Sequence, residues 1–158
     1  MNPKIVPLSR LANDTQKLRS AGKRLVATNG CFDILHVGHV RYLAAARALG
    51  DVLLVGVNGD ASTRELKGAG RPVNNENDRA EVLAALACVD LVTIFPEVRA
   101  VRFLELAQPA IYVKGGDYTV DSLDQSEKTV LEKIGADIRL IPFEKGYSTS
   151  GLLQKFKK

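Results

Sequence analysis

Residues of several kinds are scarce in this chain. Its 158 residues include two cysteines, two histidines and no tryptophan, and 6% of them are aromatic. Two distant cysteines, Cys31 and Cys88, suit free thiols in a reducing compartment better than a disulfide framework. No apolar run approaches the roughly 20 residues that span a bilayer, and the first residues lack the apolar segment of a secretory signal. These absences predict a cytoplasmic protein without a membrane partner.

Neither sign of charge strongly predominates. The formal net charge is +4, the basic residues are scattered, and only residues 155–158 form a short basic cluster. Aromatic residues of the kind that stack on bases are not interleaved with them. We therefore expect no nucleic-acid partner, while a mildly positive surface favours small phosphorylated substrates.

Apolar strand signals alternate with helix signals along the whole chain, which is 46% hydrophobic. Strands are predicted at residues 24–28, 51–57, 90–95, 110–113 and 137–141. Helices are predicted at residues 8–21, 40–49, 60–66, 77–86, 97–107, 124–134 and after 148. We find no internal repeat and no linker. The pattern predicts a single α/β domain over residues 1–158, with a Rossmann-like parallel sheet covered by helices on both faces.

Both histidines lie in one segment, Thr28-Asn-Gly-Cys-Phe-Asp-Ile-Leu-His-Val-Gly-His39, between the first predicted strand and the next helix. Gly38 allows a ligand or another backbone to approach closely, and a helix N-terminus offers unpaired N–H groups to an anion. This combination favours a phosphate site. Two other interpretations are a helix cap without chemistry and a metal site with Cys31, for which the sequence supplies no fourth ligand.

Further polar segments are predicted at the same edge of the sheet. Residues 58–60, 114–118 and 146–150 each follow a predicted strand, and ligands of such sheets gather beyond the carboxyl ends of the strands. The triplet Ser148-Thr-Ser150 begins the last helix, where its hydroxyl and N–H groups could receive a second phosphate or serve as an ordinary N-cap. We weigh these two possibilities equally on the triplet alone.

Together these motifs carry a resemblance. The segments Gly30-Cys-Phe-Asp33, His36-Val-Gly-His39, Lys114-Gly-Gly-Asp117 and Ser148-Thr-Ser150, with Arg79, resemble the cytidylyltransferase-like nucleotidyltransferase superfamily over about residues 25–156. Within it, residues 28–39, 66–74 and 113–118 are most similar to bacterial D-glycero-β-D-manno-heptose 1-phosphate adenylyltransferases. The resemblance implies the HxGH nucleotidyltransferase fold, a stand-alone enzyme with a separate sugar kinase in the same pathway, and a homo-oligomer.

The resemblance also implies a reaction, in which ATP and a sugar 1-phosphate give ADP-heptose and pyrophosphate. It implies catalytic roles for four residues, of which the last two also bind the acceptor: His36, His39, Lys67 and Arg79. The residues implied to bind the nucleotide are Cys31, Phe32, His36, Gly38, His39, Lys114, Gly116, Asp117, Ser148, Thr149 and Ser150. Asp33 either faces the acceptor or organises the turn. Mg²⁺ is expected to bind through phosphates and water, with no metal ligand from the protein.

The sequence departs from the superfamily pattern near the late motif. Related cytidylyltransferases carry an arginine shortly before it, whereas residues 143–150 contain none, and Ser150 replaces the usual threonine. The missing arginine weakens the case for CTP, and serine keeps the hydroxyl. Two alternatives remain open: a cytidylyltransferase for glycerol 3-phosphate or a similar alcohol phosphate, and a nucleotide-binding module without turnover.

Overall fold

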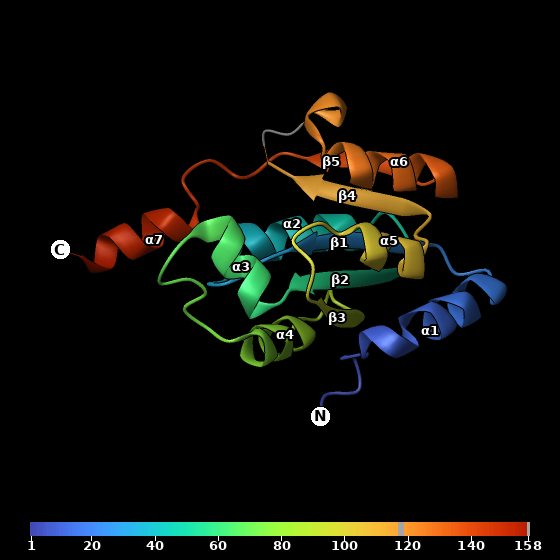
Figure 1. Cartoon of the computed structure of the whole chain (residues 1–158), viewed down its shortest axis with the longest axis horizontal. Coiled ribbons are helices and arrows are strands. Elements are labelled where there is room, and N and C mark those ends of the chain that lie inside the picture. Colours follow the sequence, from blue (N-terminus) through green and yellow to red (C-terminus); the bar gives the residue numbers. More distant parts are fainter. Residues whose placement is uncertain (117–118, 158) are drawn as a thin grey trace.

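The computed structural model describes residues 1–116 and 119–157 and confirms the predicted parallel α/β sheet (Figure 1). Its strands are β1 (Leu25–Gly30), β2 (Val52–Asn58), β3 (Leu91–Phe95), β4 (Ile111–Gly115) and β5 (Asp137–Ile141). They lie in the order β3-β2-β1-β4-β5, and all neighbours are parallel. The strand order therefore reverses between β1 and β4, which is where open parallel sheets bind ligands.

Helices cover both faces of the sheet. They are α1 (Leu8–Ser20), α2 (Val37–Arg47), α3 (Asp60–Lys67), α4 (Glu76–Ala84), α5 (Val101–Ala107), α6 (Gln125–Ile134) and α7 (Thr149–Phe156), with a 3₁₀ turn η1 (Val120–Ser122). Successive strand residues point to opposite faces, so Val26 packs with the apolar residues of α2 and α4, whereas Leu25 and Ala27 pack with those of α1, α5 and α6. Both cores contain side chains without solvent exposure.

Two helices begin three or more residues away from their predicted starts. Helix α5 begins at Val101, four residues after the predicted start. The preceding segment is held outside the helix, because Asn58 Nδ2 donates to the Glu97 carbonyl (3.2 Å) and the Ala100 N–H donates to Glu127 Oε1 (2.7 Å). Helix α2 begins at Val37, three residues earlier than predicted. This early start places the first turn of α2 within the histidine motif.

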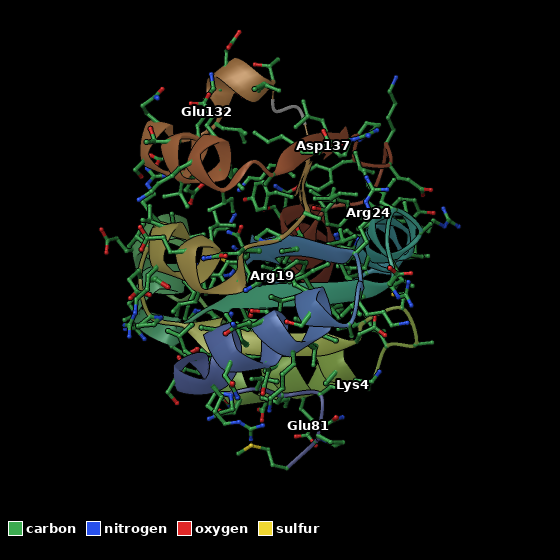
Figure 2. The ribbon with its side chains drawn as sticks, turned by 90° about the vertical axis from the view of Figure 1, so that its right-hand side faces the viewer. Lys4, Arg19, Arg24, Glu81, Glu132 and Asp137 are labelled. Carbon is green, nitrogen blue, oxygen red and sulfur yellow. The ribbon has the colours of Figure 1, made fainter. Side chains whose placement is uncertain are left out.

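The first residues of the chain cover the β3 edge of the sheet. The Val92 N–H donates to the Lys4 carbonyl (2.8 Å), and the Val6 N–H donates to the Val92 carbonyl (2.8 Å). Figure 2 labels Lys4 beside this edge and Arg19 on α1. The Nη1 atom of Arg19 donates to the carbonyl of Ala107 at the end of α5 (2.8 Å). In the described part of the chain, no helix is both long and apolar enough to cross a bilayer.

Candidate active site

A cavity of about 810 Å³ opens beyond the carboxyl ends of β1 and β4, at the point where the strand order reverses. Its volume lies within the range of roughly 300–1,000 Å³ typical of small-molecule sites. The residues predicted from sequence that line it are Cys31, Phe32, Asp33, His36, Gly38, His39, Lys67, Lys114, Ser148, Thr149 and Ser150. These residues are far apart in the chain, so the fold gathers them into one site.

The two histidine rings lie against each other at the start of α2. Their centroids are 3.9 Å apart, and His36 is the N-cap residue of the helix. The His36 N–H donates to Nδ1 of His39 (3.3 Å), so a neutral His39 carries its proton on Nε2. In the described chain, Nδ1 of His36 is buried without a hydrogen-bond partner. The pair thus offers His39 Nε2–H as a donor and His36 Nδ1 as an unused polar atom.

Close packing around the rings fixes their position. A Cβ atom at Gly38 would lie 2.9 Å from His36 Nδ1, closer than real Cβ atoms come, and 3.1 Å from the Cβ of Tyr147, which is a tight contact. Phe32 contacts the His39 ring edge-on, with centroids 5.7 Å apart, and has a positive φ of 46°. Such backbone strain in a residue other than glycine concentrates at functional sites.

The stability of the protein should depend on pH through His39. Burial, and secondarily the His36 ring, lowers the pKa of His39 from 6.5 to about 4. Between these values the unfolded chain binds a proton that the folded chain does not, so the free energy of unfolding falls as the pH decreases. We expect the contribution of His39 to lower the free energy of unfolding by about 1–2 kcal/mol as the pH falls from about 7.5 to about 4.5, allowing for the partial exposure of the ring. Urea denaturation of the wild type and of His39→Gln at the two pH values measures this decrease. An equal decrease in both proteins would contradict the role of His39.

Asp33 organises the turn, one of the two roles predicted for it. Its side chain is 1% exposed, and its oxygens accept from Arg71 Nε (2.6 Å) and from the N–H groups of Val73 (2.9 Å) and Asn74 (3.0 Å). Burial raises the pKa of Asp33, but the bonds from Asn74, Val73 and Arg71 outweigh it and hold the pKa below its ordinary value. The carboxylate therefore stays ionised and anchors the loop after α3 to the motif.

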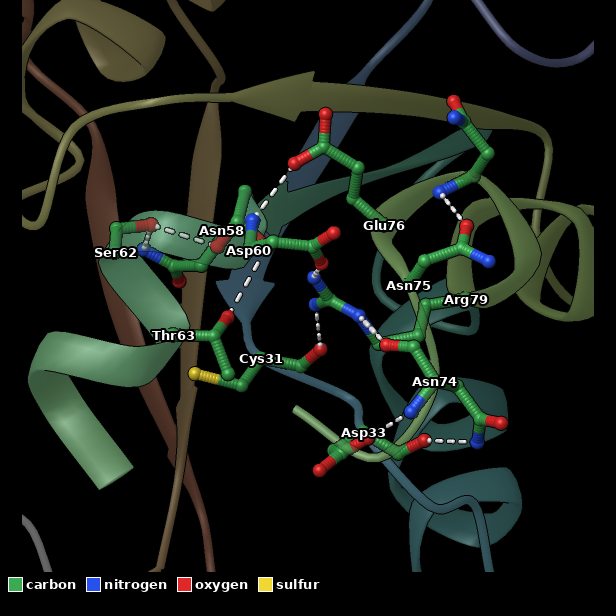
Figure 3. A network of polar contacts seen from close by, with 12 residues as sticks. Cys31, Asp33, Asn58, Asp60, Ser62, Thr63, Asn74, Asn75, Glu76 and Arg79 are labelled. Atoms are coloured by element: carbon green, nitrogen blue, oxygen red, sulfur yellow. Dashed lines mark hydrogen bonds and ion pairs between the residues drawn. The ribbon is translucent and has the colours of Figure 1, made fainter. Parts of the chain in front are cut away.

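Arg79, predicted to bind the acceptor, does not line the cavity. Figure 3 shows its side chain within a network of polar contacts. Its side chain has no solvent exposure. All three guanidinium nitrogens are committed, with Nε donating to the Asn74 carbonyl (3.0 Å), Nη1 to the Cys31 carbonyl (2.5 Å) and Nη2 to Asp60 Oδ1 (2.8 Å). Arg79 thus fastens α4 to the histidine motif and to α3, and it lies outside the cavity wall.

The start of α7 closes another side of the cavity. Ser148 is its N-cap residue, and Ser148 Oγ accepts from the Gly151 N–H (2.9 Å). Thr149 Oγ1 donates to the Ile34 carbonyl (3.0 Å), which ties this helix to the histidine motif. The Ser148 hydroxyl can still donate to a phosphate while it caps the helix, whereas the Thr149 hydroxyl already uses its proton. The N–H groups of the first turn have no acceptor within the helix and could bind an anion.

The end of β4 and the loop after it contain three residues predicted to bind the nucleotide. Lys114 lines the cavity, and burial lowers its pKa. Gly116 does not line the cavity. A Cβ on it would lie 2.6 Å from the Phe143 ring, so this glycine allows the ring to lie against the backbone. Asp117, predicted to contact the nucleotide, lies outside the described residues.

The cavity-wall residues that sequence reasoning missed include three aromatic residues and two arginines. Tyr147 stacks near His36 with centroids 6.3 Å apart, Phe143 covers Gly115 and Gly116 at the end of β4, and the Tyr42 hydroxyl bonds Thr28 Oγ1 (2.7 Å) deeper in the wall. Arg71 and Arg99 also line the cavity. Tyr147 and Arg71 lie next to or within segments that the sequence analysis singled out. The others are brought in by contacts between distant segments.

Comparisons with known proteins agree with this geometry. The family described as cytidylyltransferase-like matches residues 27–155. The bifunctional protein HldE of Geotalea uraniireducens is 50% identical over 98% of this chain, and that of a Helicobacter pylori strain is 45% identical over 99% of it. The chain spans about a third of the length of these relatives, 31% and 32% respectively.

Solved structures show the same architecture. A lipopolysaccharide core biosynthesis protein from Thermoplasma volcanium superposes with a TM-score of 0.65 and 30% identity, covering 80% of this chain and all of its own. A pantoate-beta-alanine ligase from Francisella tularensis gives a TM-score of 0.59 over 93% of this chain and 69% of its own. At 13% identity, the second likeness concerns the fold alone.

Proposed function

Because the chain belongs to the cytidylyltransferase-like family of nucleotidyltransferases, we propose that it transfers AMP from ATP to D-glycero-β-D-manno-heptose 1-phosphate. The observation that carries the proposal is the paired His36 and His39 at the start of α2, which lies beside the N-terminus of α7 on the wall of one cavity. Two anion-binding helix ends on one cavity suit a triphosphate. The similarity to HldE proteins and to a lipopolysaccharide core biosynthesis protein supports an activated sugar as the product.

The reaction needs no covalent intermediate with the protein. An oxygen of the sugar phosphate forms a bond to the α-phosphorus of ATP, the bond from that phosphorus to the β-phosphate oxygen breaks, and pyrophosphate leaves with the electron pair. The nucleophile is already ionised near neutral pH, so no general base is required. Catalysis then consists of aligning two anions and stabilising the charge that develops on the α-phosphate and leaving group.

The histidine pair suits the stabilising role. With a pKa of about 4 for His39, the free site at neutral pH holds this ring in its neutral form, and the His36 N–H fixes its tautomer so that Nε2–H is the donor. A preorganised donor of this kind costs no rearrangement when charge develops. We assign His39 to the α-phosphate and His36 to the adjoining phosphate oxygens.

The phosphates that leave are assigned to the first turn of α7. The Ser148 hydroxyl and the free N–H groups of residues 149–150 lie at the positive end of the helix dipole. Lys67 at the end of α3 and Lys114 at the end of β4 add positive charge to the cavity wall. These groups would hold pyrophosphate in line with the attacking oxygen.

Magnesium is proposed to enter with the nucleotide. Among the described residues, no cluster of three or more histidine, cysteine, aspartate or glutamate side chains could hold a metal ion. Mg²⁺ keeps several waters and binds readily to substrate phosphates, so a cavity lined by lysine, arginine and helix N-termini fits an ion carried on ATP. Such an ion would neutralise charge between the phosphates, and the protein residues would orient the complex.

The test is pyrophosphate release in the presence of Mg²⁺, with ATP or CTP offered against heptose 1-phosphate or glycerol 3-phosphate. We expect turnover only with ATP and heptose 1-phosphate. Turnover only with CTP and glycerol 3-phosphate would replace the proposed substrates while keeping the mechanism. Melting shifts with nucleotide but no pyrophosphate in any combination would contradict the proposed enzyme and favour a binding module.

A further inference from the structure

We infer that Arg71, held in place by Asp33, is the residue that binds the phosphate of the acceptor. This inference rests on the proposed function, since it names the group that positions the second substrate of that reaction. It assigns Arg71 a substrate contact and gives Asp33 a positioning role. The sequence prediction placed Arg79 in this contact, and the structure gives the two arginines opposite surroundings.

The surroundings of Arg71 are those of an oriented ligand-binding arginine. Its side chain is 17% exposed and lines the same cavity as His39 and Lys67. Only Nε is engaged, donating to Asp33 Oδ2 over 2.6 Å. Within residues 1–116 and 119–157, its Nη1 and Nη2 atoms donate to no protein acceptor. One edge of the guanidinium is thus fixed to the protein, and the remaining N–H groups are available to a ligand.

Arg79 has no such capacity. Its three nitrogens donate to Asn74, Cys31 and Asp60, and its side chain is fully buried outside the cavity wall. A phosphate could reach it only if those bonds broke and α4 moved. The two arginines therefore differ in use: one fastens the segments together, and the other presents its free donors to the cavity.

The bond between Arg71 and Asp33 is not needed to hold the loop after α3 in place. The same Asp33 carboxylate accepts from the N–H groups of Val73 and Asn74, and the Asp33 carbonyl accepts from Asn74 Nδ2 (2.9 Å). These bonds hold residues 73–74 on the motif without any contribution from the guanidinium. The additional bond to Nε restricts the rotation of the guanidinium, which lowers the entropy cost of gripping a ligand.

The chemistry of the free edge fits a phosphate monoester. A guanidinium presents parallel N–H groups that match two oxygens of a phosphate, and such charged pairs are stronger than neutral hydrogen bonds. The acceptor must bring a doubly charged phosphate close to the triphosphate, so a cation fixed between them reduces their repulsion. Lys67 contributes charge from an exposed, flexible side chain, whereas Arg71 contributes charge and direction.

The experiment compares Arg71→Gln, Arg71→Lys and the control Arg64→Gln, which removes an exposed α3 arginine outside the cavity wall. Steady-state pyrophosphate release gives KM separately for ATP and for the acceptor. We expect Arg71→Gln to raise the acceptor KM about 10- to 100-fold and the ATP KM less than about twofold. Arg71→Lys should fall between, since it keeps the charge without the fork. Arg64→Gln should match the wild type.

Equal rises in both KM values, or an unchanged acceptor KM, would overturn the inference. The acceptor used is the one that the wild type turns over. The wild type therefore tests whether heptose 1-phosphate is the substrate, and the KM values of the variants test the role of Arg71. If the wild type turns over neither acceptor, calorimetric titration with inorganic phosphate in the presence of α,β-methylene-ATP replaces kinetics. Weaker phosphate binding by Arg71→Gln than by Arg64→Gln then supports the inference, and equal binding, or none in the wild type, overturns it.

Discussion

Replacing His39 by alanine is expected to lower kcat about 10²- to 10³-fold, the cost typical of losing one preorganised donor to a transition state. In the free protein, Nδ1 of His39 accepts a hydrogen bond from the His36 N–H. The proton of the neutral ring is therefore on Nε2, which remains available as a donor. Because that donor acts on charge that develops during the reaction, KM for the nucleotide should change far less than kcat. Pyrophosphate release with the substrates that the wild type uses provides the measurement.

Val40→Ala is the matched control for His39→Ala. Val40 lies one residue further along α2, is 38% exposed and does not line the cavity. Its removal should leave kcat within about twofold, because exposed substitutions have small effects. Circular dichroism establishes that both variants keep the fold. Activity of folded His39→Ala close to that of the control would falsify the role assigned to the histidine.

The second large effect concerns stability. Arg79→Met keeps the length of the side chain but removes all three hydrogen bonds, leaving the carbonyls of Cys31 and Asn74 and one oxygen of Asp60 without this partner. We expect the free energy of unfolding to fall by about 3 kcal/mol, since unsatisfied buried groups and a broken ion pair both contribute. Asp60 is 35% exposed, and water at its carboxylate limits the loss. Urea denaturation at neutral pH measures the change.

Arg102→Met provides the comparison for this loss. Arg102 also pairs with an acid, Glu97, but its side chain is 60% exposed and the pair lies 3.3 Å apart at the surface. Such pairs contribute roughly 0–1 kcal/mol. A loss in Arg79→Met no greater than that in Arg102→Met would show that the buried network of Figure 3 does not stabilise the fold in the way described.

Much of the fold could be predicted because the strands are short, apolar and separated by helix signals, a pattern typical of a parallel sheet covered by helices. The first and last residues of individual helices and strands could not be predicted. Helix α5 starts late because Asn58 and Glu127 hold its expected first residues elsewhere. β4 extends through Lys114 and Gly115, weak strand formers, because they pair with Leu140 and Ile141 of β5. Both corrections come from residues distant in the chain.

The site shows the same division. The histidines and the serine triplet could be found because helix N-termini and glycine turns have local sequence signatures. The roles of Arg71, in the loop after α3, and of Arg79, on α4, could not be assigned, since charged side chains are expected at the surface. The burial of Arg79 depends on the Cys31 carbonyl, 48 residues away. The orientation of Arg71 depends on Asp33, 38 residues away, and neither partner is marked by spacing.

The bond from Thr149 to the Ile34 carbonyl joins groups 115 residues apart. All five strands precede α7 in the chain, and this helix contains no buried residue. Closing so long a loop carries a large entropy cost before any contact repays it. During synthesis on the ribosome, the strands can therefore assemble while the last helix is still in the exit tunnel. The proposed triphosphate site would then be completed only after the sheet has formed.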